Sequence, residues 1–132
     1  TETDIAAALF SPTSRVFCDL AEADGRTVGF ALWFYTFSTF VGRHGIYLED
    51  LFVEPAFRGR GIGKALLRHL AGRCVAEKLG RLEWSVLDWN EPSIQFYRAQ
   101  GARLLDEWTM CRVDGEALQK LGADRGSEEA DA

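Results

Sequence analysis

The stretch Arg58-Gly59-Arg60-Gly61-Ile62-Gly63-Lys64 decides the fold of this chain, because it joins an apolar strand to a long amphipathic helix. The apolar run 46–53 precedes it, and after it apolar residues recur at helical spacing. Glycines let a backbone come close to a ligand, and the free N–H groups that open a helix attract anions. The stretch therefore predicts a cradle for a diphosphate, with Arg58, Arg60 and Lys64 as counter-charge.

Spacing separates the cofactors that use such a turn. The nucleotide-triphosphate loop needs a glycine where Arg58 stands and a hydroxyl where Ala65 stands, so that interpretation fails twice. The dinucleotide fingerprint needs a third glycine where Lys64 stands. A third pattern, Arg/Gln-x-x-Gly-x-Gly/Ala after a strand, is met by Arg58, Gly61 and Gly63. The alternative is a glycine turn that only connects a strand to a helix.

A second block, residues 89–101, indicates a short helix with its boundary signals in order. Asn90 suits the N-cap, Pro92 the first turn, and Gly101 the position after the C-cap. Ile94 and the pair 96–97 supply the buried side of this helix.

Together these motifs resemble the GNAT superfamily of N-acetyltransferases, whose pyrophosphate signature and late Asn…Phe-Tyr…Gly motif they match. The runs 47–53, 58–63 and 89–97 resemble more narrowly the spermidine/spermine branch, which includes thialysine acetyltransferases. This resemblance implies an α+β fold, an α/β three-layer sandwich with a mixed central sheet between helices. In the family a strand and a helix come before the element at residues 2–10. Either the printed residues omit an N-terminal segment or the protein is shortened; we expect the first, because otherwise the strand at 15–22 would be an exposed sheet edge.

The chain is expected to form one domain over residues 1–121, followed by a flexible acidic tail over 122–132. Helices are predicted at 2–10, 61–79 (ended by Gly80) and 91–100, with a helical turn at 116–121. Strands are predicted at 15–22, 28–36, 44–53, 81–87, 103–105 and 109–113, with the first two forming a hairpin around Asp24-Gly25.

The resemblance implies acetyl-CoA as the cofactor. The pantetheine arm would lie beside a strand end, the pyrophosphate on the glycine loop, and the sulfur end near the late helix. The matching residues are Leu51, Phe52, Val53, Arg58, Gly59, Arg60, Gly61, Ile62, Gly63, Lys64, Asn90, Glu91, Pro92, Ser93 and Tyr97.

Acetyl transfer requires a deprotonated amine, whose pKa in a lysine-like group is about 10, and a proton for the departing thiolate. The resemblance gives Tyr97 the role of general acid, the alternative being a core tyrosine packed beside Phe96. It gives Glu49 the role of a base acting through water, or of an electrostatic anchor. The alternative for Glu49 is a structural ion pair. Adjacent residues of a strand point to opposite faces, so Glu49 and Asp50 are expected to have different roles.

A small cationic amine is the expected substrate: a diamine, a polyamine or a lysine analogue. A second positive charge several carbons from the reacting nitrogen would need carboxylates at both ends of the pocket. The residues expected to contact it are Glu49, Asp50, Glu83, Trp84, Ser85 and Glu107. In the alternative, Asp106 and Glu107 are solvated turn charges. Acetylation of a protein lysine or N-terminal amine, and a non-catalytic acetyl-CoA sensor, remain as other functions.

Composition limits the partners. A net charge of −5 argues against nucleic acid, and the longest uncharged run, 27–42, is shorter than the roughly 20 residues of a membrane helix. Cys18, Cys74 and Cys111 are isolated, so buried free thiols and a cytoplasmic protein are expected. No metal site is expected, because His44 and His69 have no partner at ligand spacing. The branch implies a homodimer that meets through residues near 103–113.

Overall fold

The computed structural model of the chain describes residues 1–123. It divides into two compact units, Thr1–Gln100 and Gly101–Ala132, each described by itself below. The first unit contains α1 (Glu2–Phe10), β1 (Phe17–Ala23), β2 (Arg26–Ser38), β3 (Arg43–Val53), the 3-10 turn η1 (Pro55–Phe57), α2 (Ile62–Ala76), β4 (Leu82–Glu83) and α3 (Glu91–Ala99). The second unit contains α4 (Gly115–Ala123).

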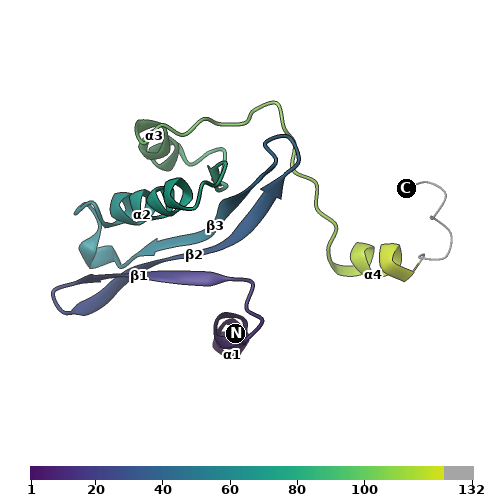
Figure 1. Ribbon diagram of the computed structural model, residues 1–132, viewed down its shortest axis with the longest axis horizontal. Coiled ribbons are helices and arrows are strands. Elements are labelled where there is room, and N and C mark those ends of the chain that lie inside the picture. Colours follow the sequence, from purple (N-terminus) through teal and green to yellow (C-terminus); the bar gives the residue numbers. More distant parts are fainter. Residues whose placement is uncertain (124–132) are drawn as a thin grey trace. The chain divides into compact units, whose positions relative to one another are not determined.

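The four strands form one mixed sheet in the order β1-β2-β3-β4 (Figure 1). β1, β2 and β3 are antiparallel neighbours, and β4 runs parallel to β3. The β1–β2 hairpin turns at Asp24 and Gly25, which both have positive φ, at 52° and 78°. Such a two-residue turn matches the twist of the flanking strands. The α+β class and the mixed sheet are confirmed.

The core of the first unit lies between one face of the sheet and α2. Ala31, Trp33, Ile46 and Leu48 of the sheet are buried against four residues of α2: Leu66, Leu67, Leu70 and Cys74. These four recur at helical spacing, and each buried leucine contributes about 1.5–3 kcal/mol. α3 lies on the same side of the sheet as α2 and adds Phe96 and Tyr97 to this cluster (Figure 1).

α2 ends three residues before the predicted end at residue 79. Lys78 takes the left-handed conformation, with a φ of 59°. The N–H of Leu79 then donates to the carbonyl of Cys74 at 2.8 Å, and that of Lys78 to the carbonyl of Val75 at 3.2 Å. This is a Schellman closure, made by a lysine where a glycine is usual. Gly80 has another role, because a Cβ there would lie 2.7 Å from Val41 Cγ1.

The caps of the two short helices of the first unit follow their sequence signals. Thr1 and Asp4 form a capping box at α1, whose predicted bounds are confirmed. At α3 the side chain of Asn90 accepts from the N–H of Ser93 at 3.4 Å, and Gly101 follows the C-cap with a φ of 94°. Both cap predictions for α3 are confirmed.

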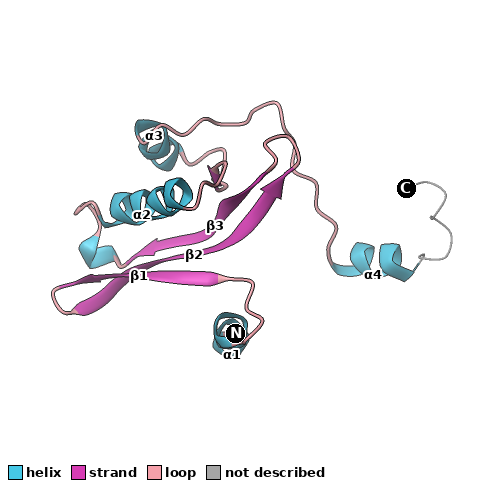
Figure 2. Ribbon diagram, viewed as in Figure 1, coloured by secondary structure: helices cyan, strands magenta, loops and turns pink. Residues whose placement is uncertain are grey.

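Three strand predictions are wrong. The strand expected over 81–87 is reduced to β4, and the described residues 101–114 contain neither of the strands expected at 103–105 and 109–113 (Figure 2). A strand needs a neighbour to take its backbone hydrogen bonds, and residues 101–114 pair with no described strand. Cys111 is consequently exposed, not buried as predicted, whereas Cys74 is buried and Cys18 half-buried.

The second unit ends, within the described residues, in α4, which extends the predicted turn at 116–121 to nine residues. Gly122 and Ala123 of the predicted tail belong to α4, and 124–132 lie outside the described residues. None of the described helices is long and apolar enough to cross a membrane.

Candidate functional site

The glycine loop between η1 and α2 presents free backbone N–H groups at one point. Gly59 and Gly61 have φ values of 83° and 80°, a region that favours glycine. Gly61 is the N-cap of α2, and the first bond of the helix runs from the N–H of Ala65 to the carbonyl of Gly61 at 2.9 Å. The N–H groups before Ala65 therefore have no intrahelical acceptor, and they lie at the positive end of the helix dipole.

Gly63 leaves space beside this helix start. A Cβ built on Gly63 would meet only Val53 Cγ2, at 3.9 Å, and its φ is not positive. Glycine is therefore not required there by strain or by the described neighbours. Space next to free N–H groups fits a diphosphate that comes close to the backbone.

The cations around the loop divide into two groups. Arg58 donates from Nε to the carbonyl of Val53 at 2.9 Å. Arg60 lies 3.6 Å from the Asp24 carboxylate, so it is directed toward the β1–β2 turn. Lys64 and Arg68 instead line a depression of about 330 Å³ together with Gly61 and Ala65.

Arg68 was not among the predicted site residues. Its spacing of four from Lys64 would have identified it, because residues at i and i+4 share a helix face. Neither Lys64 nor Arg68 forms an ion pair with another described residue.

β3 and β4 are paired over a short stretch only. Their parallel pairing consists of two rungs, Ile46 with Leu82 and Tyr47 with Glu83. Beyond Tyr47, residues 48–53 of β3 have no paired strand among the described residues on the side away from β2. We call this segment the open edge of β3. Unpaired strand edges offer hydrogen bonds to an extended ligand, and the open edge contains the predicted cofactor residues Leu51, Phe52 and Val53.

A β-bulge places the two predicted carboxylates within the open edge. Leu32 pairs with Asp50 and Trp33 with Leu48, so Glu49 is the extra residue. The bulge interrupts strict alternation, so the assumption that Glu49 and Asp50 point to opposite faces does not hold at this pair. Both residues are exposed, and neither forms an ion pair with another described residue. The predicted ion-pair alternative for Glu49 thus has no partner in the described part of the chain.

Tyr97 lies half-buried on α3, between two aromatic rings. Its ring meets Trp84 edge-on at 5.1 Å between centroids and lies 5.5 Å from Phe96. Burial raises the pKa of the Tyr97 phenol, which favours its protonated form. Within residues 1–123 its hydroxyl has no hydrogen-bond partner. The predicted residues Glu91, Pro92 and Ser93 form the first turn of the same helix.

The three residues predicted from the strand after α2 make separate contacts. Trp84 packs against Tyr97, on the side of the core cluster. Glu83 lies 3.2 Å from Arg81 Nε, and Ser85 Oγ lies 2.7 Å from the hydroxyl of Tyr47. Glu107 belongs to the second unit, where it is exposed in a turn closed by the N–H of Trp108 and the carbonyl of Leu105.

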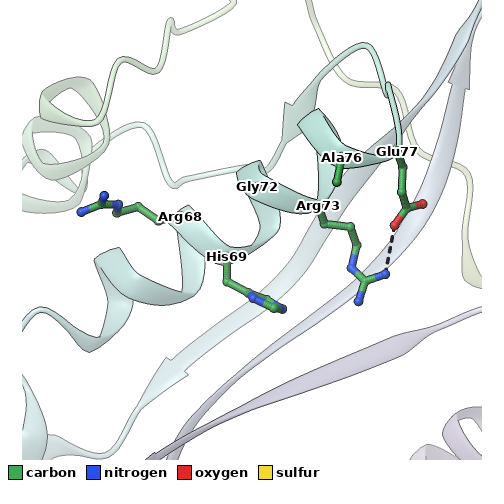
Figure 3. Close-up of a pocket in the computed structure, with 6 residues that line it drawn as sticks. All are labelled: Arg68, His69, Gly72, Arg73, Ala76 and Glu77. Atoms are coloured by element: carbon green, nitrogen blue, oxygen red, sulfur yellow. Dashed lines mark hydrogen bonds and ion pairs between the residues drawn. The ribbon is translucent and has the colours of Figure 1, made fainter.

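A larger depression, of about 430 Å³, lies farther along α2 and is lined by Arg68, His69, Gly72, Arg73, Ala76 and Glu77 (Figure 3). Arg73 Nη1 pairs with Glu77 Oε2 at 3.0 Å, and the hydroxyl of Tyr35 donates to Glu77 Oε1 at 2.7 Å. These contacts join the end of α2 to β2. They pair Arg73 with Glu77, while Arg73 Nε is buried without a hydrogen-bond partner and Arg68 forms no ion pair within the described residues. We assign the chemistry to the glycine loop and the open edge, because these contain the predicted motif residues.

The histidines make no metal site. His69 Nε2 lies 3.3 Å from Asp19, and His44 Nδ1 lies 3.1 Å from the carbonyl of Thr36. Across residues 1–123 there is no group of three or more His, Cys, Asp or Glu residues that could hold a metal ion.

Comparison with known proteins places these features in a family. The model of the acetyltransferase (GNAT) family matches residues 1–102. The chain is 42% identical over 93 residues to the L-ornithine N5-acetyltransferase of Arabidopsis thaliana, covering 70% of this chain and 41% of that protein. It is 39% identical over 97 residues to the thialysine N-epsilon-acetyltransferase of Bos taurus, covering 71% and 56%. The chain thus spans about half the length of these curated relatives.

One solved structure matches a larger share of this chain than these relatives do. An integron cassette protein from the mobile metagenome of V. cholerae superposes with a TM-score of 0.80 and 33% identity. The match covers 92% of this chain and 78% of that protein.

Proposed function

The chain belongs to the acetyltransferase (GNAT) family, and on that premise we propose that it transfers an acetyl group from acetyl-CoA to a primary amine of a small cationic substrate. The observation that carries this proposal is the open edge of β3, which begins where β4 leaves the sheet and ends near the glycine loop. An anion cradle that follows an unpaired strand edge suits a ligand in which a diphosphate is joined to an amide-containing arm.

The residues available for acetyl-CoA fit its parts. The N–H groups of residues 61–64, with Lys64 and Arg68 beside them, would hold the pyrophosphate. The backbone of Leu51–Val53 would pair with the pantetheine arm, and the first turn of α3 would line the sulfur end. Arg58 and Arg60 are engaged with Val53 and Asp24 and would have to turn to contribute. When bound, acetyl-CoA supplies the acetyl group as a thioester.

Two side chains would move protons. Tyr97 would hold a proton on its phenolic oxygen at neutral pH, because a phenol has an ordinary pKa of about 10 and burial raises the pKa of Tyr97 further. That proton is the one that a general acid would donate. Glu49 is exposed on the bulge, where it would accept a proton from the substrate ammonium through water, or anchor that ammonium. A backbone N–H of the open edge would donate to the oxygen on which charge develops.

The amine is proposed to be a diamine, a polyamine or a lysine analogue. Relatives named for ornithine and thialysine acetylation support a substrate that carries more than one charged group. Asp50, Glu83, Trp84 and Ser85 are proposed to contact it, and Glu107 to provide a carboxylate for its distal charge. We also propose a homodimer in the cytoplasm with no nucleic-acid partner.

Thiol release from acetyl-CoA with a panel of amines tests the proposal. The panel should hold monoamines, diamines, basic amino acids and a lysine-containing peptide. Release that depends on small cationic amines supports the proposed activity. Release with the peptide alone would favour a protein acetyltransferase, and acetyl-CoA binding without release for any amine would favour a sensor.

A further inference from the structure

One pair of hydroxyl groups spans the point where β4 leaves the sheet. The hydroxyl of Tyr47 lies 2.7 Å from Ser85 Oγ. Tyr47 belongs to the last rung of the β3–β4 ladder, where it pairs with Glu83, and Ser85 follows two residues after that rung. Within residues 1–123 the ladder has no rung beyond Glu83. The hydroxyl pair therefore continues the contact between β3 and the segment after β4.

The neighbouring strand fixes the Tyr47 side of this pair. Phe34 of β2 is the register partner of Tyr47, and their rings stack with centroids 5.2 Å apart. Ile46 and Leu48, on either side of Tyr47, are buried in the core, so Tyr47 points to the face of the sheet opposite α2. Stacking across strands restricts both rings, so the Tyr47 hydroxyl is held in place to bond Ser85.

The residue next to Ser85 contacts the candidate acid on the other face. Trp84 packs against the core cluster, and its ring meets that of Tyr97 edge-on at 5.1 Å between centroids. The segment after β4 is thus held from both faces, by Ser85 on one and by Trp84 on the other. The Tyr97 hydroxyl has no hydrogen-bond partner within residues 1–123, so packing against Trp84 and Phe96 orients the Tyr97 ring.

We propose that Tyr47 and Ser85 are positioning residues for acetyl transfer. Their hydroxyl pair holds Trp84 against Tyr97, and so sets where the acid stands relative to a thioester on the open edge of β3. Misplacement of a reacting group by about 1 Å can lower a rate roughly 10²-fold. The inference rests on the proposed function. It gives Ser85 a role that does not require contact with the amine, and kinetics separate the two roles.

Deleting each hydroxyl tests the bond. Tyr47→Phe keeps the ring that stacks on Phe34, and Ser85→Ala keeps the backbone. Each should lower kcat roughly tenfold or more, with little change in the KM for the amine or in the dissociation constant of acetyl-CoA. The double variant should be no slower than either single variant, because both changes remove the same bond. Ser85→Thr retains a hydroxyl and should keep most of the wild-type kcat.

Two further comparisons separate positioning from a general loss of structure. In a Tyr97→Phe background, Tyr47→Phe should lower kcat little further, because its effect acts through Tyr97. Tyr35→Phe is the matched control, since it removes another tyrosine hydroxyl, which donates to Glu77 at 2.7 Å and joins β2 to the end of α2. It should lower the unfolding temperature about as much as Tyr47→Phe does and leave kcat unchanged.

Four outcomes would overturn the positioning role while leaving amine acetylation in place. They are a kcat within about threefold of wild type for Tyr47→Phe, additive losses in the double variant, an undiminished loss in the Tyr97→Phe background, and an equal loss of kcat in Tyr35→Phe. A raised KM for the amine in Ser85→Ala alone would make Ser85 a substrate contact instead. Failure of the wild-type protein to acetylate any amine would overturn the proposed function and this inference with it.

Discussion

Replacing Gly63 by alanine separates a role in coenzyme binding from a role in folding. Gly63 is the second residue of α2, its φ is not positive, and a Cβ there would touch only Val53 Cγ2 at 3.9 Å. Alanine in a helix is more stable than glycine by up to about 1 kcal/mol, so the variant should unfold at the same or a higher temperature.

The same methyl group should weaken acetyl-CoA binding. It would occupy the space through which a diphosphate reaches the free N–H groups of the helix start. Losing one charge-assisted hydrogen bond of about 1.5–3 kcal/mol corresponds to a dissociation constant roughly 10- to 100-fold higher. Titration calorimetry with acetyl-CoA measures this, and differential scanning calorimetry measures the stability. Higher stability together with weaker binding is a combination that damage to the fold does not produce.

Gly72→Ala is the matched control. Gly72 lies inside the same helix, and a Cβ there would meet nothing within 4 Å. It borders the larger depression, away from the glycine loop (Figure 3). Its substitution should raise stability and leave acetyl-CoA affinity unchanged. Affinity within twofold of wild type for Gly63→Ala, or equal losses for both variants, would refute the assignment of the diphosphate to this loop.

Three other predictions concern catalysis, stability and assembly. Tyr97→Phe should lower kcat by roughly 10²–10⁴ with little change in acetyl-CoA affinity, because it removes proton donation; a kcat within about threefold of wild type would make Tyr97 a packing residue. The pKa of Glu77 is lowered from its ordinary 4.5, chiefly by the hydrogen bond from Tyr35, so its contribution to stability is present above pH 4.5 and lost as the pH falls below it. Glu77→Gln should therefore flatten the loss of stability that thermal melts record as the pH falls below 4.5, and an unchanged slope would contradict this coupling. Light scattering should show a homodimer, which we propose forms through residues near 103–113. A monomer at micromolar concentration would exclude this assembly.

The sequence predicted the helix ends and the turn that are fixed by a capping side chain or by positive φ. Thr1 and Asn90 cap their helices through their own side chains, and Asp24-Gly25 turns the hairpin because both positions need positive φ. The glycine loop was likewise predictable, because Gly59 and Gly61 adopt conformations that other residues avoid.

Features that depend on distant residues were not predictable in the same way. The end of α2 was assigned to Gly80, yet Lys78 closes the helix, and Leu79 then packs against the core. The bulge at Glu49 depends on the register of β3 against β2, and no residue type within β3 predicts it. The strands expected after residue 101 had the right apolar pattern, but a pattern does not supply a pairing partner.

A crystal structure of the protein with acetyl-CoA would show whether the glycine loop and the open edge of β3 hold the coenzyme. We expect the pyrophosphate against the backbone N–H groups of residues 61–64, and the pantetheine arm beside Leu51–Val53 on the open edge. The thioester sulfur should then lie within hydrogen-bonding reach of the Tyr97 hydroxyl. Coenzyme bound elsewhere, for example in the depression beside Arg73 and Glu77, with the open edge left unpaired, would contradict this assignment of the coenzyme site.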